Sequence, residues 1–293
     1  MFVWKRLRPW ACAGFAGWLL AAVAAAAQPL WLTLPKLPGM PAPLTSGYAP
    51  VDGIRMYYAE FGSGEPVLLL HGGLANSAYW AAVIPTLVRH HFRVIVADLR
   101  GQGRSTRDTR PYSYDLMSTD VLDLLDYLHL RRVDLVGWSD GGIIGLDIAL
   151  HEPHRLRRMF LYGASSNPAG VRPDVADNPT FAAYLRRTRP EYEALSATPD
   201  NYSSLLAAIE QMWATQPHFT TRQLHTICVP TVIADGAHDE AIKRSQSVYL
   251  AKVIPGAKLI IFPDLSHFGM LQNPPEFAAA AVKFFRVDRK SVV

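Results

Sequence analysis

Short apolar runs alternate with longer amphipathic stretches along most of the chain. The apolar runs are typical of strands buried on both faces of a sheet, and they fall at 66–71, 92–97, 133–136, 159–162, 231–234 and 259–262. An Asp52-Gly53 pair before a further run at 54–61 predicts a β-hairpin turn. The clearest amphipathic stretch is 115–130, where leucine and valine recur near helical spacing. Strands alternating with helices predict an α/β fold, with a mostly parallel twisted sheet and helices on both faces.

One interval breaks this alternation. Residues 166–225 show no pattern of a buried strand, but they carry helix-like pieces near 180–189 and 202–215. We therefore expect an α-helical cap inserted into the α/β core. A cap over the carboxyl ends of the strands would cover a ligand site. A peripheral helical pair with no role at the site is the alternative.

The N-terminus has the three parts of a secretory signal. Basic residues between positions 5 and 8 precede an uncharged, mostly apolar run at 10–27, which ends in three alanines. We expect residues 1–27 to be a signal peptide and the protein to be exported, periplasmic or secreted. An uncleaved membrane anchor is the alternative. Residues 28–47 hold five prolines, which predicts an extended Pro-rich linker before a domain of residues 48–293.

The charge balance argues against a nucleic-acid partner. The 293-residue chain has 29 Lys and Arg against 25 Asp and Glu, a net charge of +4. Without residues 1–27 the counts become 26 and 25, and the remaining arginine clusters are not interleaved with aromatic residues as a nucleic-acid surface would be. Cys228 would then be the only cysteine, and its apolar neighbours predict that it is buried.

The chemistry concentrates at Gly137-Trp138-Ser139-Asp140-Gly141. This G-x-S-x-G sequence follows an expected strand and precedes an expected helix, which is the context of a nucleophile elbow. The turn is so sharp that the residues two positions away on either side of the serine must lack side chains. The serine hydroxyl then projects beside the positive end of a helix.

A serine nucleophile needs a base, and the base needs an acid to orient it. Among ten histidines, His267 lies in a loop beyond the last expected strand, at the edge of the sheet that also carries Ser139. His151 and His154 flank a proline without a nearby third ligand, so a metal site is not expected there. Three acids follow the strand at 231–234.

Those three acids are Asp235, Asp239 and Glu240. Asp235 still belongs to the strand end and Glu240 begins the next element, so Asp239 is best placed to face His267. The chain order Ser139, Asp239, His267 is that of an α/β-hydrolase triad.

With these motifs in place, the chain resembles the α/β-hydrolase fold superfamily over roughly residues 48–288. The matching segments are 71–73, 98–105, 137–142, 236–239 and 266–268. The elbow is also similar to that of valacyclovir-hydrolase-like esterases.

The resemblance implies a role for each residue of the site. Ser139 would attack an acyl carbon, His267 would carry the proton, and Asp239 would hold the imidazole. The backbone N–H groups of Asp140 and Gly73 would form the oxyanion hole, with Leu74 competing for the place of Gly73. No metal or organic cofactor is implied.

Asp140 is unusual beside the nucleophile. Its carboxylate would attract cationic substrates such as α-amino acid esters, unless it turns away into a hydrogen bond with the backbone or with an arginine. The candidate arginines are Arg100, Arg104 and Arg107. Expected apolar walls of the pocket are Trp138, Trp213 and Phe268, with Met212 and Met270 as further candidates.

The sequence thus predicts a serine hydrolase that cleaves a small-molecule carboxylic ester through an acyl-enzyme intermediate. The alternatives are amide or aminopeptidase-type hydrolysis, and C–C bond hydrolysis or perhydrolysis on the same triad. A binding module that kept the fold is a further alternative.

Overall fold

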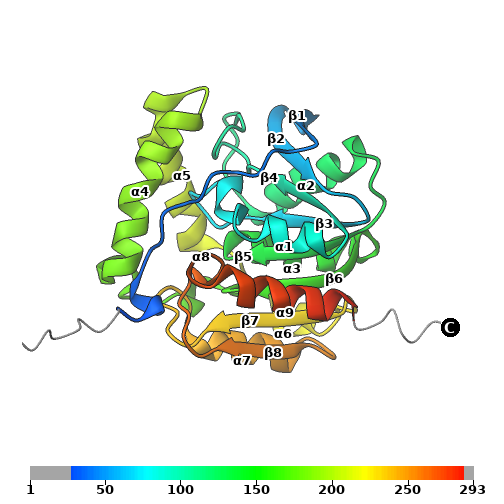
Figure 1. Cartoon of the computed structure of the whole chain (residues 1–293). Coiled ribbons are helices and arrows are strands. Elements are labelled where there is room, and N and C mark those ends of the chain that lie inside the picture. Colours follow the sequence, from blue (N-terminus) through cyan, green and yellow to red (C-terminus); the bar gives the residue numbers. More distant parts are fainter. Residues whose placement is uncertain (1–27, 287–293) are drawn as a thin grey trace, which may run out of the picture.

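In the part of the chain that the structure describes, eight strands form one sheet in the order β1-β2-β4-β3-β5-β6-β7-β8 (Figure 1). The computed structural model describes residues 28–286, so the expected signal peptide at 1–27 lies outside the described residues. Strands β3 to β8 pair in parallel, whereas β1–β2 and β2–β4 are antiparallel. The strands are β1 (Thr45–Val51), β2 (Ile54–Phe61), β3 (Glu65–Leu70), β4 (Phe92–Ala97), β5 (Val133–Trp138), β6 (Leu156–Tyr162), β7 (Thr231–Gly236) and β8 (Lys258–Phe262).

Helices cover both faces of this sheet. They are α1 (Ile84–Arg89), α2 (Tyr114–Tyr127), α3 (Asp140–His151), α4 (Pro179–Leu195), α5 (Tyr202–Thr215), α6 (Thr221–Leu224), α7 (Arg244–Val253), α8 (Gly269–Gln272) and α9 (Pro274–Arg286). Successive residues of a strand point to opposite faces. On β3, Leu68 and Leu70 join the core beneath α2 and α3, and Val67 and Leu69 join the core beneath α1 and α9. The predicted α/β architecture is confirmed.

The Asp-Gly turn was predicted from its two residues alone. Val51 of β1 pairs with Ile54 of β2, and the two turn residues adopt positive φ, 32° at Asp52 and 80° at Gly53. Positive φ at both central positions is what a two-residue hairpin turn requires. The hairpin is therefore confirmed.

The chain between β6 and β7 carries the helices α4, α5 and α6 and short 3₁₀ turns, as expected for residues 166–225. In Figure 1, α4 and α5 stand together beside one end of the sheet. Asn178 begins α4, since its side chain accepts hydrogen bonds from the backbone N–H groups of Thr180 and Phe181. We call residues 166–225 the cap.

The proline-rich segment, expected as an extended linker, also contacts the domain. Strand β1 begins at Thr45, before the expected boundary at Tyr48, and the residues ahead of it contact the domain. The Trp31 ring stacks on His238, with ring centroids 4.0 Å apart. Arg187 of the cap donates to the Pro35 carbonyl at 2.6 Å. The prolines keep this segment extended, and its side chains and carbonyls bind it to the surface.

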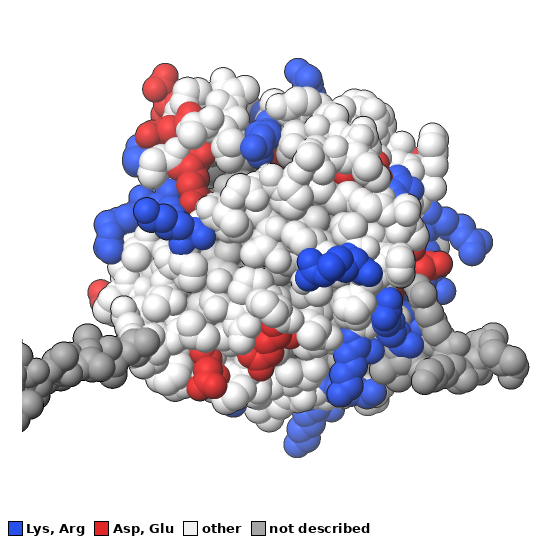
Figure 2. Space-filling view, in the orientation of Figure 1, with Lys and Arg blue, Asp and Glu red and all other residues white. Residues whose placement is uncertain are grey.

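Acidic and basic side chains share the face shown in Figure 2, with wide uncharged areas between them. Within residues 28–286, no helix combines the length and apolar character needed to cross a membrane. Cys228 is exposed rather than buried. Its neighbours Ile227 and Val229 point into the core, so the residue between them points outward.

Candidate active site

Ser139 occupies the tight turn between β5 and α3, with φ 53° and ψ −116°. A non-glycine residue at positive φ is strained. A β-carbon at Gly137 would collide with the Gly141 carbonyl, and one at Gly141 would collide with the Leu70 carbonyl. The two glycines of the elbow therefore allow this turn to pack against β3.

The loop after β8 brings His267 against the acid predicted for it. His267 Nδ1 lies 2.7 Å from Asp239 Oδ2, and both side chains are buried. The other oxygen, Asp239 Oδ1, accepts from the backbone N–H groups of Ala241 at 2.7 Å and Ile242 at 2.6 Å. Both oxygens of the carboxylate are therefore held in place. The carboxylate accepts the Nδ1–H of His267, which leaves Nε2 as the unprotonated nitrogen that can accept a proton.

The two competing acids have other partners. Asp235 accepts a hydrogen bond from the Ser247 hydroxyl. Glu240 accepts from the backbone N–H of His267 at 2.9 Å and from the Ser266 hydroxyl at 3.2 Å. Among the three acids, the structure places Asp239 on the imidazole, as the sequence analysis expected.

Burial dominates the electrostatics of this pair. It lowers the pKa of His267 below its ordinary value, although the nearby carboxyls of Glu240, Asp235 and Asp140 oppose the shift. Burial also raises the pKa of Asp239. A neutral imidazole near neutral pH is the protonation state that a general base needs.

The turn after β3 packs directly against the elbow. A β-carbon at Gly72 would lie 3.1 Å from Ser139 Cβ, and one at Gly73 would collide with Trp213 and Asp140. The backbone N–H of Leu74 donates to Gln102 Oε1 at 2.5 Å and is therefore already used. This geometry favours Gly73 over Leu74 as the partner of the Asp140 N–H in an oxyanion hole.

Asp140 points into the site, and its partners are aromatic side chains. It accepts from the Tyr114 hydroxyl at 2.8 Å and from Trp213 Nε1 at 3.0 Å, and it is 3% exposed. Burial raises the pKa of Asp140 to about 6, while the two hydrogen bonds lower it. The pKa of this carboxyl group therefore lies closer to neutral pH than that of a solvent-exposed aspartate.

The arginines suggested as partners of Asp140 bind elsewhere. Arg100 is buried against Asp120, Arg104 lies 3.3 Å from Asp98, and Arg107 donates to the Ser204 hydroxyl at 2.7 Å. The suggestion of an arginine partner was wrong. The residues that hold Asp140 come from α2 and α5, which the motif around Ser139 could not reveal.

A cavity of about 340 Å³ joins these residues. Ser139 and His267 both line it, as do Asp140 and Trp213. Most of the remaining wall is apolar or uncharged, with contributions from α2, α3, the loop after β6, the cap and the loop after β7: Tyr114, Ile143, Ser165, Asn167, Pro168, Val171, Val175, Phe181, Ala214, Gln216, Pro217, Ala241 and Ile242. The cap therefore forms much of the wall, as its position predicted.

Trp138 and Phe268 do not line this cavity. Trp138 is 1% exposed and Phe268 is fully buried, and their rings lie 5.8 Å apart behind the imidazole. The Trp138 ring centroid is 5.7 Å from that of His267. Both side chains thus support the base from the core instead of contacting a ligand. Met212 and Met270 are also core residues.

Phe181 and Tyr114 were missed as wall residues. Phe181 belongs to the first turn of α4 and Tyr114 to the first turn of α2. Phe181 lies in the expected helical piece 180–189 and Tyr114 just before the amphipathic stretch 115–130, but such a pattern does not give the direction of a single side chain. Only the packing of the cap on the core places them at the cavity.

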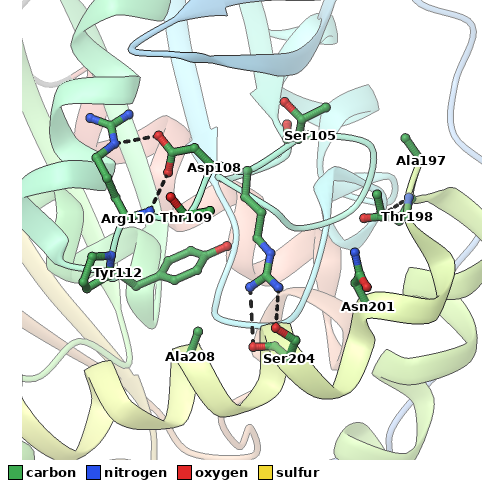
Figure 3. A pocket seen from close by; sticks show the side chains of 14 residues that line it. Ser105, Asp108, Thr109, Arg110, Tyr112, Ala197, Thr198, Asn201, Ser204 and Ala208 are labelled. Atoms are coloured by element: carbon green, nitrogen blue, oxygen red, sulfur yellow. Dashed lines mark hydrogen bonds and ion pairs between the residues drawn. The ribbon is translucent and has the colours of Figure 1, made fainter.

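A second cavity, of about 560 Å³, lies between the loop at 105–112 and the cap (Figure 3). Ser204 and Asn201 of the cap face Asp108 and Arg110 across it. Arg110 is paired with Asp108 and Asp52. This cavity is larger than the first, but it contains none of Ser139, Asp239 and His267.

One group of residues has metal-ligand character. Ligand atoms of Asp115, Asp147 and His151 lie within 4.8 Å of one another on α2 and α3. The fold thus brings His151 two acids that the sequence did not indicate. Asp115 and His151 are exposed, and none of the three lines the cavity beside Ser139.

The chain matches the family model described as "alpha/beta hydrolase fold" over residues 65–215, and so it belongs to the α/β-hydrolase fold family. It is 26% identical over 246 residues to serine hydrolase BPHL of Mus musculus, covering 80% of this chain and 84% of that protein. This similarity confirms the resemblance to valacyclovir-hydrolase-like enzymes.

Relatives with other named activities are equally similar. The 2-hydroxy-6-oxo-2,4-heptadienoate hydrolase of Pseudomonas putida is 30% identical over 267 residues, covering 80% of this chain and 94% of that protein. The solved meta-cleavage product hydrolase from Pseudomonas fluorescens IP01 has a TM-score of 0.72 at 24% identity, covering 83% and 97% of the two chains. These relatives support a hydrolase that acts on a small molecule.

Proposed function

We propose that this protein is a serine hydrolase that cleaves carboxylic esters through an acyl-enzyme intermediate. One observation carries the proposal. Ser139 and His267 line the same cavity, and His267 Nδ1 is hydrogen-bonded to Asp239 at 2.7 Å. The acid is thus bonded to the base, and the base lies in the same cavity as the serine, which is the arrangement that a serine nucleophile needs.

In this mechanism, His267 Nε2 takes the proton of Ser139 as its oxygen attacks the ester carbonyl carbon. The negative oxygen of the tetrahedral intermediate accepts hydrogen bonds from the backbone N–H groups of Gly73 and Asp140. His267 then protonates the departing alcohol, which leaves an acyl group on Ser139. A water molecule, deprotonated by the same imidazole, hydrolyses the acyl-enzyme. No step needs a metal or an organic cofactor.

The charge of the cavity favours an ester as the substrate. It disfavours a dienoate, which the name of the Pseudomonas putida relative indicates as the substrate of that enzyme. A dienoate carries a carboxylate, which is held most readily by arginine or lysine. No arginine or lysine is among the residues that line the 340 Å³ cavity within the described chain. Asp140, which does line it, would repel a carboxylate. A neutral or cationic ester therefore suits this cavity better.

A fluorophosphonate probe tests the proposal because it reacts with activated serines. The purified protein should be labelled at Ser139, and Ser139→Ala should abolish both labelling and the hydrolysis of p-nitrophenyl esters. Ser165→Ala is the matched control, since Ser165 lines the same cavity. Labelling that survives Ser139→Ala would exclude Ser139 as the nucleophile. No labelling of the unaltered protein would leave a binding module as the better explanation.

Asp140 favours a second candidate, the hydrolysis of α-amino esters or amides. It is a carboxyl group beside the nucleophile without an arginine or lysine partner among the described residues. A substrate ammonium group would supply the missing positive charge. With Asp140→Asn, the preference for aminoacyl over neutral esters should fall about 10-fold or more. An unchanged preference would leave the neutral ester as the substrate class.

We also propose that the protein is exported, on the strength of the basic, apolar and small-residue pattern at 1–27. Mass spectrometry of the protein from a producing cell tests this. A mature N-terminus near Gln28 in the exported fraction is expected, whereas a membrane-bound protein that still begins at Met1 would indicate an anchor.

A further inference from the structure

Three carboxyl groups lie near one imidazole at the ends of β7 and β8, and one of them, Asp239, contacts the ring. Asp235 is fully buried, and Asp239, Glu240 and His267 are each less than 10% exposed. Within residues 28–286, no lysine or arginine side chain forms an ion pair with any of the three acids. Three ionised carboxylates this close together in a buried site would repel one another strongly. At least one of them must hold a proton.

The contacts of Asp235 identify it as the protonated group. Its Oδ2 accepts from the Ser247 hydroxyl, but its Oδ1 is buried and receives no donor. Asp239 is the acidic neighbour of this group, and its charge and a side-chain hydrogen bond between the two carboxyl groups raise the pKa of Asp235. Two carboxyl groups form such a bond only when one of them carries the hydrogen. A proton on Asp235 Oδ1 gives that buried atom its partner.

Asp239 is the better site for the negative charge. Its Oδ1 accepts two backbone N–H groups, from Ala241 and Ile242, and its Oδ2 faces His267 Nδ1. All three of these bonds are stronger to an ionised carboxylate than to a neutral carboxylic acid. Among the described residues, Asp235 accepts one hydrogen bond, from the Ser247 hydroxyl, and is therefore the group that stays neutral.

We propose that Asp235 is a neutral carboxylic acid that donates its proton in a hydrogen bond to Asp239, and so positions the acid of the triad. This inference rests on the proposed function. Asp235 does not touch a substrate, because it is absent from the cavity wall. It acts through Asp239 by fixing the carboxylate and stabilising its charge.

The groups around Asp235 favour this protonation state. Burial raises the pKa of Asp235 well above its ordinary value, and the neighbouring Asp239 raises it further. The hydrogen bond from Asp235 lowers the pKa of Asp239. The other titratable or charged groups nearby are Glu240 and His267 on the adjoining loops and Tyr162 on β6, together with Arg244, which reaches the Gly236 carbonyl at 3.5 Å.

Two substitutions separate the proposed role from simple packing. Asp235→Asn keeps a donor toward Asp239 and an acceptor toward Ser247, so kcat and the acid limb of the kcat/KM profile should match the wild type. Asp235→Ala removes the donor, which leaves Asp239 more basic. Its kcat should fall on the order of 10-fold, with little change in KM, and its acid limb should move to higher pH. Ser247→Ala is the control, and the acid limb of its kcat/KM profile should stay at the pH of the wild type.

Infrared difference spectra test the proton without using activity. The wild type minus Asp235→Asn should show the band of a protonated carboxylic acid. Its absence, or an acid limb that moves to lower pH in Asp235→Asn, would mean that Asp235 is ionised and would overturn the proposal. This measurement also stands if Asp235→Ala fails to fold. Failure of Ser139 to react with fluorophosphonate would reject the hydrolase function separately, whatever the spectra show.

Discussion

Trp213 of the cap donates its indole N–H to both carboxylate oxygens of Asp140, each at 3.0 Å. Asp140 is the first residue of α3 and directly follows Ser139. The cap is therefore hydrogen-bonded to Asp140, whose backbone N–H we assign to the oxyanion hole. The docking of the cap and the electrostatics of the elbow are therefore linked through this pair.

Trp213→Phe tests that coupling. The substitution keeps a ring in the wall but removes a donor that lowers the pKa of Asp140, so this pKa should rise above about 6. As the pH falls, protonation of Asp140 should lower kcat/KM for an α-amino ester relative to kcat/KM for a neutral ester. In Trp213→Phe this decrease should begin at a higher pH than in the wild type. Identical pH dependence of this ratio in the two proteins would show that the indole N–H has no effect on Asp140.

The pH dependence of kcat/KM for a neutral ester should report His267. Activity needs the neutral imidazole, and burial lowers its pKa from 6.5. The imidazole therefore stays neutral to lower pH than a free histidine, and the midpoint of the acid limb should lie below pH 6.5. A midpoint above pH 7 would contradict the proposed effect of burial.

Gly163→Ala should damage the site through contact alone. Gly163 follows β6 at φ 62°, and a β-carbon there would lie 2.7 Å from Cε1 and 2.8 Å from Nδ1 of His267. Displacing the imidazole should lower kcat on the order of 100-fold. Gly256→Ala is a matched control, since Gly256 has φ 69° with no atom within 4 Å of the added carbon. This variant should lose about 1 kcal/mol of stability but keep its activity.

Asp134→Asn should stabilise the protein at neutral pH. Burial raises the pKa of Asp134 to about 6, although Arg157 and Arg158 oppose the shift. The folded state thus binds this proton more tightly than the unfolded state, so stability is lost as the pH rises from about 4 through about 6. The asparagine should raise the free energy of unfolding by about 1–2 kcal/mol at pH 7.5.

The gain from Asp134→Asn should shrink as the pH falls. Thermal unfolding at pH 7.5 and pH 4.5 measures this difference. A stabilisation that is equal at both pH values would indicate an effect of packing rather than of charge.

The parts of the site fixed by local geometry could be predicted from the sequence. The elbow needs Gly137 and Gly141 around Ser139, and chain order together with strand ends places Asp239 and His267 at the same edge of the sheet. The motif and the strand pattern are both local features of the sequence. They were therefore sufficient to predict the fold and the positions of Ser139, Asp239 and His267.

The partners of Asp140 could not be predicted in this way. Trp213 is 73 residues away along the chain and Tyr114 is 26 residues away, so their contact depends on how the cap docks. The position of Phe268 could not be predicted either. The apolar sequence around it predicts an apolar environment, but not whether that environment is the core or the cavity. Cys228 was misplaced because its apolar neighbours alternate in direction.

The Gln272 side chain donates to the Thr33 carbonyl at 2.9 Å across 239 residues of sequence, and also to the Ser266 hydroxyl beside His267. The two ends of the described chain therefore meet at the loop that carries the base. Contacts this distant in sequence close late in folding. A growing chain holds the nucleophile long before its base is synthesised and seated, so the enzyme is expected to remain inactive until the loop that carries His267 has been made and has docked.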